Sequence, residues 1–206
     1  MIKKILDKIA NSGDDQKIVL IDPNSLESRP DPDLRIIGMF CDVHEEKVAE
    51  VIHAMLYLNE MNKLDPKNVR PIEFYLSTYG GSADDMFGLY DVMRGIRQET
   101  EIHTLGLGKV MSAGVLLLAA GTKGKRRIAK NCRVMIHSVA AGNHGNLQDL
   151  TNELEAIQDL QDMYTNCLVA ETNMTESDIK DMLNRNVNVY LSAVEAVKLG
   201  IADIIV

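Results

Sequence analysis

Between residues 35 and 120 the chain alternates three times between strand-like and helix-like patterns of apolar residues. The strand-like segments are residues 35–40, 72–78 and 101–106, and a segment with helical spacing follows each of them, at residues 42–62, 82–96 and 115–120. Strands that are separated by helices are joined by crossover connections and pair in parallel. The alternation therefore predicts an α/β domain with a parallel sheet. A length of 206 residues favours a single domain.

Four helix starts are indicated by a capping residue with an acidic residue three positions later. These pairs are Asp42 with Glu45, Ser82 with Asp85, Thr175 with Asp178, and Ser192 with Glu195. In each pair the first side chain accepts a hydrogen bond from the backbone of the third helical residue. Short apolar runs predict two further strands at residues 126–129 and 133–137, and a last strand at residues 201–206.

One long amphipathic helix is predicted from Asn146 to about Thr172. Its apolar residues recur with helical, nearly heptad spacing, with acidic residues between them. Such a stripe needs a partner to cover it. The partner is either the rest of the same domain or a second subunit, and the spacing does not decide between them.

The net charge of −8 argues against a surface for nucleic acid or for an anionic membrane. The four basic residues between Lys123 and Arg127 are expected to form a solvated turn or a local contact. No Gly-x-x-x-x-Gly-Lys-[Ser/Thr] motif occurs, so no nucleotide site is recognised, and neither a cofactor nor a metal is expected.

The cysteines and the first residues indicate a cytoplasmic protein. Cys41, Cys132 and Cys167 are widely spaced, which fits buried thiols in a reducing compartment better than disulfides. Residues 1–10 have the pattern of a short amphipathic helix whose apolar stretch is interrupted by charge, unlike a signal peptide. Between residues 11 and 34, only residues 18–21 are strand-like.

Ser112 is the first candidate for chemistry. It lies between Gly108 and Gly114, where a predicted strand leads into the apolar helical run at residues 115–120. Free amide groups at a helix start can stabilise an anion beside the serine oxygen, as acyl transfer requires. The alternative is that Ser112 only caps the helix, because serine is a favoured N-cap residue.

Two other features supply the remaining parts of an acyl-transfer site. Gly80 and Gly81 join a strand to a helix start, a pattern that suits an oxyanion hole, a phosphate cradle or an ordinary turn. His137 ends an apolar strand, where a histidine is either structural or catalytic. A serine at a helix start, an amide-rich turn and a strand-end imidazole together favour acyl transfer.

Several motifs in register resemble the proteolytic subunit of the Clp protease. They are Tyr75-Leu-Ser-Thr-Tyr-Gly-Gly-Ser, Gly108-Lys-Val-Met-Ser-Ala-Gly, Lys123-Gly-Lys-Arg, Asn131-Cys-Arg-Val-Met-Ile-His and Tyr190-Leu-Ser-Ala-Val-Glu-Ala-Val-Lys-Leu-Gly. Their order and spacing extend the resemblance from about Arg35 to Val206. Several motifs in order are far more specific than any one of them.

The resemblance implies a serine endopeptidase of crotonase-like fold, a single domain over residues 1–206 with a divergent segment at 1–34. The head would consist of repeated β-β-α units, and a handle region at about 139–185 would contain the long helix. The family assembles as heptameric rings that stack as a tetradecamer, degrades peptides or unfolded proteins, and docks to a hexameric AAA+ unfoldase. Since no nucleotide motif occurs, energy-dependent degradation would need that separate ATPase.

Carried over by position, Ser112 would be the nucleophile, His137 the general base, and the amides of Gly81 and Ala113 the oxyanion hole. The family's catalytic aspartate corresponds to Asn188 here. An amide oxygen can hold the imidazole through its Nδ1–H group but supplies no negative charge to stabilise the imidazolium. A weak or conditional peptidase is therefore expected, with Asp181 as a less favoured substitute acid.

Other departures concern partners. At the unfoldase docking site Tyr75 is kept, whereas Glu73 replaces an aromatic residue. Two rival functions remain: an acyl-CoA hydratase or isomerase of the same superfold, and a non-catalytic ring subunit that assembles with an active paralogue. The first normally needs acidic catalytic residues, and Asn188 is the feature in favour of the second. A Ser-Lys peptidase is less favoured, because it would leave His137 idle.

Overall fold

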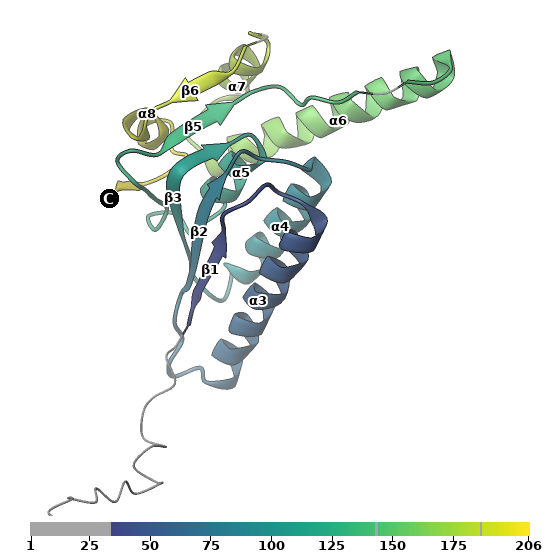
Figure 1. Cartoon of the computed structure of the whole chain (residues 1–206). Helices are drawn as coiled ribbons and strands as arrows, with labels where there is room; N and C mark the ends of the chain where they lie inside the picture. The colour runs from purple at the N-terminus through teal and green to yellow at the C-terminus, as the bar shows by residue number, and fades with distance from the viewer. Residues whose placement is uncertain (1–33, 143, 186) are drawn as a thin grey trace, which may run out of the picture. The chain divides into compact units, whose positions relative to one another are not determined.

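The computed structural model describes residues 34–142, 144–185 and 187–206 (Figure 1). Arg35–Val206 forms one compact unit. The helix expected at residues 1–10, the strand expected at 18–21 and nearly all of the divergent segment lie outside the described residues. The assignment of the whole chain to a single domain therefore stays a prediction.

The described residues contain a sheet of seven strands. They are β1 (Ile36–Met39), β2 (Ile72–Thr78), β3 (Ile102–Met111), β4 (Arg127–Ile128), β5 (Arg133–Ile136), β6 (Val189–Leu191) and β7 (Ile204–Ile205). The strands β1-β2-β3-β4-β7 are neighbours in this order. β5 pairs with the C-terminal end of β3, and β6 pairs with β5. All of these pairs are parallel except β5–β6. The predicted α/β fold with a parallel sheet is confirmed.

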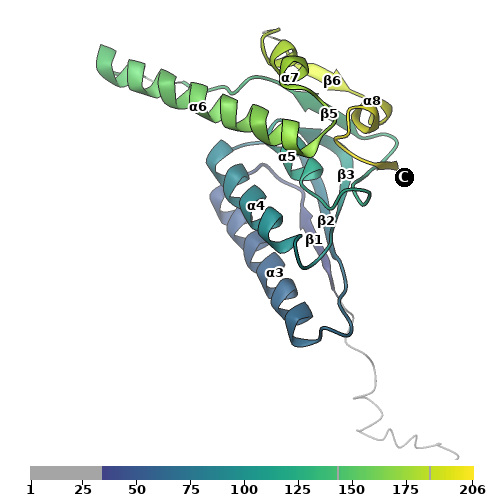
Figure 2. The same ribbon diagram turned by 180° about the vertical axis from the view of Figure 1, so that it is seen from behind.

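The helices between the strands pack against the sheet and enclose the core with it. They are α3 (Glu45–Leu64), α4 (Ala83–Ile96), α5 (Ala113–Ala119), α6 (Leu147–Glu171), α7 (Glu176–Leu183) and α8 (Ala193–Lys198). α3 and α4 lie side by side along the sheet (Figures 1 and 2). Every residue of α5 is buried, so this short helix is the centre of the core. The core is largely aliphatic and methionine-rich, with few aromatic side chains.

Three of the four predicted helix starts are confirmed. Ser82, Thr175 and Ser192 accept backbone hydrogen bonds from Asp85, Asp178 and Glu195, respectively. The fourth prediction is wrong, because α3 begins after His44 and not at Asp42. The reason lies in Val43, which is held extended: its N–H donates to the carbonyl of Gly80 (2.7 Å) and its carbonyl accepts from the N–H of Ser82 (2.9 Å).

The long helix predicted from residue 146 is confirmed as α6. Its last turns pack against the core through Tyr164 and Leu168, which are buried. Its first turns extend away from the sheet (Figure 1), and leave Leu147 83% and Leu154 56% exposed. The apolar stripe is thus covered by the same domain at one end only.

Two expectations need correction, for the last strand and for the cysteines, while the basic cluster makes one of the two contacts expected of it. The last strand is shorter than predicted, because residues 201–203 turn so that the Asp203 carboxylate binds Arg126. Arg126 is only 4% exposed and also donates to the carbonyl of Glu171, so this part of the basic cluster makes a buried local contact. Of the three cysteines, Cys132 is buried, Cys167 is partly buried and Cys41 is exposed, contrary to the expected burial.

Candidate active site

Ser112 occupies a strained turn between β3 and α5. Its backbone has φ 54° and ψ −123°, and it is the one non-glycine residue with positive φ in the described chain. Such a conformation costs about 1–3 kcal/mol and persists only where the surroundings hold it. Although Ser112 stands at the N-cap position of α5, its side chain makes no capping hydrogen bond. The capping interpretation therefore fails, and the hydroxyl is free for another partner.

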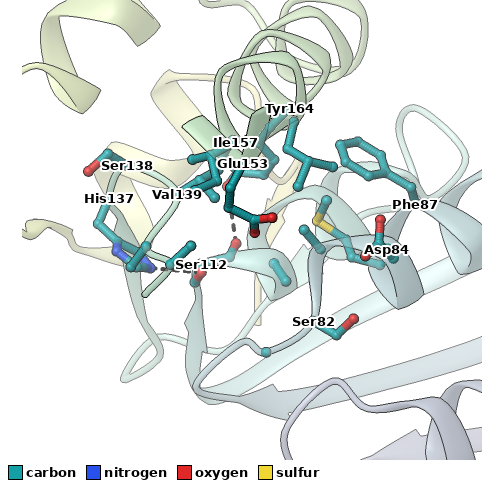
Figure 3. A pocket seen from close by; sticks show the side chains of 17 residues that line it. Ser82, Asp84, Phe87, Ser112, His137, Ser138, Val139, Glu153, Ile157 and Tyr164 are labelled. Atoms are coloured by element: carbon teal, nitrogen blue, oxygen red, sulfur yellow. Dashed lines mark hydrogen bonds between the residues drawn. The ribbon is translucent and has the colours of Figure 1, made fainter. Parts of the chain in front are cut away.

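That partner is His137. The Nε2 atom of its imidazole lies 2.8 Å from the Oγ atom of Ser112 (Figure 3). The contact follows from the topology: β3 and β5 pair in parallel with Met111 opposite Met135, so both strands end at the same edge of the sheet. Ser112 follows β3 directly and His137 follows β5 directly. A nucleophile and a base within hydrogen-bond reach are the first requirement of serine catalysis.

The backbone of Ser112 is fixed from two sides. Its N–H donates to the carbonyl of Met135 (2.8 Å), and its carbonyl accepts from the Tyr164 hydroxyl on α6 (3.1 Å). Burial raises the pKa of Tyr164, so the phenol stays protonated as a donor. The sequence placed Tyr164 only in the apolar stripe of the long helix. The available signal was its hydroxyl, because a buried tyrosine usually finds a hydrogen-bond partner.

The Gly80–Gly81 turn lies against Ser112 from the end of β2. Gly80 has φ +105° and Gly81 has φ +149°, which other residues rarely adopt. A side chain at Gly80 would place its Cβ atom 2.6 Å from the Cβ atom of Ser112. Glycine is therefore required both for the backbone conformation and for the close approach of the two turns.

Two amides beside Ser112 have no hydrogen-bond acceptor among the described residues, those of Gly81 and Ala113. Their neighbours are engaged: the N–H of Gly80 donates to Thr78 Oγ1 (3.0 Å), and the N–H of Ser82 donates to a backbone carbonyl. These free amides are the two that the family resemblance assigned to the oxyanion hole. Unpaired backbone donors next to a nucleophile are what a developing oxyanion needs.

Asn188 precedes β6, the strand that pairs with β5, and makes no hydrogen bond to His137. β5 and β6 pair antiparallel, and the last pair is Ile136 with Val189, so His137 and Asn188 are the next residues on each strand. Side chains at opposing positions of such a pair are neighbours, with Cβ atoms about 5 Å apart. Asn188 is nevertheless exposed, and His137 Nδ1 has no partner among the described residues. Asp181, the substitute acid, is exposed on α7.

A cavity of about 360 Å³ opens beside the Ser112–His137 pair. Its apolar lining includes Met86 and Phe87 of α4 and Ile157 and Leu160 of α6, together with Ala113 of α5 and Val139 after β5. Figure 3 shows the Glu153 side chain entering the same space from α6, above Ser112. Within residues 34–142, 144–185 and 187–206, no cluster of three metal-ligating side chains occurs, and no helix is long and apolar enough to cross a membrane.

Comparison with known proteins identifies the family of this chain. A family model described as Clp protease matches residues 32–206. The chain is 32% identical to the ATP-dependent Clp protease proteolytic subunit 1 of Prochlorococcus marinus (strain MIT 9312), over 83% of each chain. It is 32% identical to proteolytic subunit 1 of Corynebacterium glutamicum over 82% of this chain and 77% of the relative, and 30% identical to proteolytic subunit 2 of Frankia casuarinae over 82% and 74%. The α/β architecture, the matched span and these relatives together show that the chain belongs to the Clp protease proteolytic subunit family.

Proposed function

We propose that this chain is a serine endopeptidase that cleaves peptides or unfolded polypeptides through an acyl-enzyme. The single observation that carries the proposal is the 2.8 Å contact between Ser112 Oγ and His137 Nε2, made by a serine that does not cap its helix. A serine hydroxyl is a weak nucleophile unless a base accepts its proton. The imidazole is placed to accept that proton.

The proposed reaction has two halves. Ser112 Oγ attacks the scissile carbonyl carbon while His137 Nε2 takes the hydroxyl proton, and the oxyanion binds the amides of Gly81 and Ala113. The imidazolium then gives its proton to the leaving amine as the C–N bond breaks. A water molecule hydrolyses the resulting ester by the same sequence, which returns the proton to Ser112. Each oxyanion donor is worth about 3 kcal/mol in such a site.

Peptide hydrolysis tests the proposal. Purified chain should cleave fluorogenic peptides, and Ser112→Ala and His137→Ala should each abolish cleavage while circular dichroism shows an intact fold. Ser138→Ala is the matched control, because Ser138 neighbours His137 at the rim of the cavity without contacting the reacting hydroxyl. Activity that survives Ser112→Ala would refute the mechanism, and would favour the acyl-CoA chemistry of the wider superfold if it required a thioester.

A second candidate function is a non-catalytic ring subunit that works with an active paralogue. The observation in its favour is Asn188, which is exposed and unbonded to His137. In an enzyme with an aspartate at the third position, replacing the carboxylate with an amide lowers kcat by about 10⁴. Mixing this chain with an active relative separates the two functions: a non-catalytic subunit changes the partner's activity while its own Ser112 stays unreactive.

The assembly that the family implies is part of the proposal: heptameric rings, stacked as a tetradecamer in the cytoplasm, served by a hexameric AAA+ unfoldase. The exposed leucines on the first turns of α6 support an interface there, because exposed apolar stripes mark association sites. Unfoldase docking has a polar element in this chain: Glu73 binds His103 and Arg127 on the sheet face. Native mass spectrometry and substrate degradation with an added unfoldase test these points.

A further inference from the structure

The cavity beside Ser112 is lined by both apolar and acidic side chains. Buried Met86 and Phe87 contribute apolar surface from α4, and half-buried Ile157 and Leu160 contribute it from α6. The charged side chains that line it are Glu153 and Asp84. Neither lysine nor arginine lines it, so the cavity carries uncompensated negative charge when both carboxyls are ionised.

Neither carboxylate has a hydrogen-bond or ion-pair partner among the described residues. Glu153 lies on α6, a helix of 25 residues with no lysine or arginine, so no cation on its own helix can approach it. Figure 3 shows its carboxylate over the cavity, with Asp84 and Phe87 on one side and His137 on the other. Asp84 lies in the first turn of α4, where the helix dipole already favours a negative charge. Glu153 lies beyond the first turn of α6, where no helix dipole favours its negative charge, and the proposal therefore rests on Glu153.

We propose that this cavity binds the substrate side chain on the acyl side of the scissile bond and selects lysine or arginine there, with Glu153 as the specificity-determining residue. The inference rests on the proposed function. Lysine and arginine have long apolar stems and charged ends, and they bury the stem while the end stays near water. The stem would lie along Met86, Phe87 and Ile157, and the cation would reach Glu153 with Asp84 as a secondary partner.

The position of the cavity gives the assignment to the acyl side. Ser112, Ala113 and Gly81 all line it, so it adjoins both the attacking oxygen and the two oxyanion amides. The side chain next to the scissile carbonyl is attached one bond away from the carbon that Ser112 attacks. It is therefore the part of the substrate that reaches the cavity first.

Binding without turnover tests the selectivity directly. Ser112→Ala protein is titrated with two fluorescent peptides that differ at one residue, lysine or norleucine, which share the apolar stem and differ in the charged end. We expect roughly fivefold tighter binding of the lysine peptide, the ratio for a partly exposed ion pair, falling as salt is raised. Glu153→Gln in the same background should bring the ratio close to one. Glu155→Gln is the matched control, because Glu155 is exposed on α6 and does not line the cavity.

Equal or tighter binding of the norleucine peptide would overturn the inference, as would an equal loss of selectivity in Glu155→Gln. The wild-type chain is then tested with lysyl and norleucyl aminocoumarin substrates, which have a peptide on the acyl side only, and lysine should again be preferred in kcat/KM. Turnover without lysine preference contradicts this inference and leaves the peptidase proposal standing. Lysine-selective binding without turnover or Ser112 labelling contradicts the peptidase proposal alone.

Discussion

Replacing Asn188 with aspartate should increase peptide hydrolysis. The β5–β6 register ends at the pair Ile136–Val189, and continuing it by one residue brings residue 188 opposite His137, where paired Cβ atoms are generally about 5 Å apart. A carboxylate 5 Å from the imidazolium of the transition state gains about 3 kcal/mol at an effective dielectric constant of 20 and about 0.8 kcal/mol in bulk water. Because residue 188 is exposed, the gain should lie between these limits, at about 1.4 kcal/mol. This corresponds to a roughly tenfold rise in kcat/KM.

The assay is kcat/KM on one fluorogenic peptide at low and high salt, for the wild type, Asn188→Asp and a charge-matched control. Asn68→Asp is that control, because it makes the same chemical change at an exposed position in the loop between α3 and β2. Asn188→Asp should gain most at low salt, and Asn68→Asp should change nothing. An unchanged or lower kcat/KM in Asn188→Asp, or an equal gain in Asn68→Asp, would refute the reasoning about the missing charge.

Three further predictions concern the scaffold around the site. Burial alone would raise the pKa of Glu171, but hydrogen bonds from Arg97 and Tyr90 outweigh this effect and hold the pKa below its ordinary value. The ionised Glu171 therefore stabilises the folded state at neutral pH, and this stabilisation is lost as the pH falls below the ordinary carboxyl range. Glu171→Gln should lower the free energy of unfolding by about 3 kcal/mol at pH 7 in urea denaturation, and by much less at pH 3; an equal loss at both pH values would contradict this. Gly81→Ala should abolish hydrolysis, because its Cβ atom would clash with a neighbouring backbone carbonyl, and an active variant would show that the turn accepts a side chain at this position. Tyr164→Phe should cost about 1 kcal/mol in unfolding free energy by leaving the Ser112 carbonyl without its donor, and an unchanged midpoint in thermal unfolding would disprove it.

The parts of the fold that follow a strong local pattern could be predicted from the sequence. Periodic apolar residues located α4 and α6, and the pairing of a capping residue with an acidic residue located the starts of α4, α7 and α8. The same signal failed at Asp42, because the backbone of Val43 is held by hydrogen bonds to the Gly80–Gly81 turn. A long-range contact of this kind leaves no mark in the local pattern.

Strand β6 is a second element that a long-range contact determines and that the local sequence pattern does not reveal. Val189–Leu191 has only three residues, one of them buried, and it is a strand because it pairs with β5. Missing β6 also hid the position of Asn188. The family motif names Asn188 from the sequence, but only the structure shows that Asn188 precedes a strand paired with β5 and makes no hydrogen bond to His137.

For the candidate site, the order of the motifs in the sequence is enough to group Ser112, His137, Gly81 and Ala113. The strained backbone of Ser112 could be seen only in the structure. The same holds for the hydrogen bonds that occupy the amides of Gly80 and Ser82 and leave the amide of Gly81 free. It also holds for Glu153, which is one of several acidic residues on α6 in the sequence and is singled out only by the cavity.

The central claim is that Ser112 is an activated nucleophile although Asn188 supplies no charge. The most direct measurement is intact-mass detection of a fluorophosphonate adduct on the folded, assembled protein, with peptide mapping and with His137→Ala as the control. The account predicts stoichiometric labelling at Ser112 that His137→Ala abolishes. No adduct in a folded and assembled sample, or labelling that does not depend on His137, would contradict it.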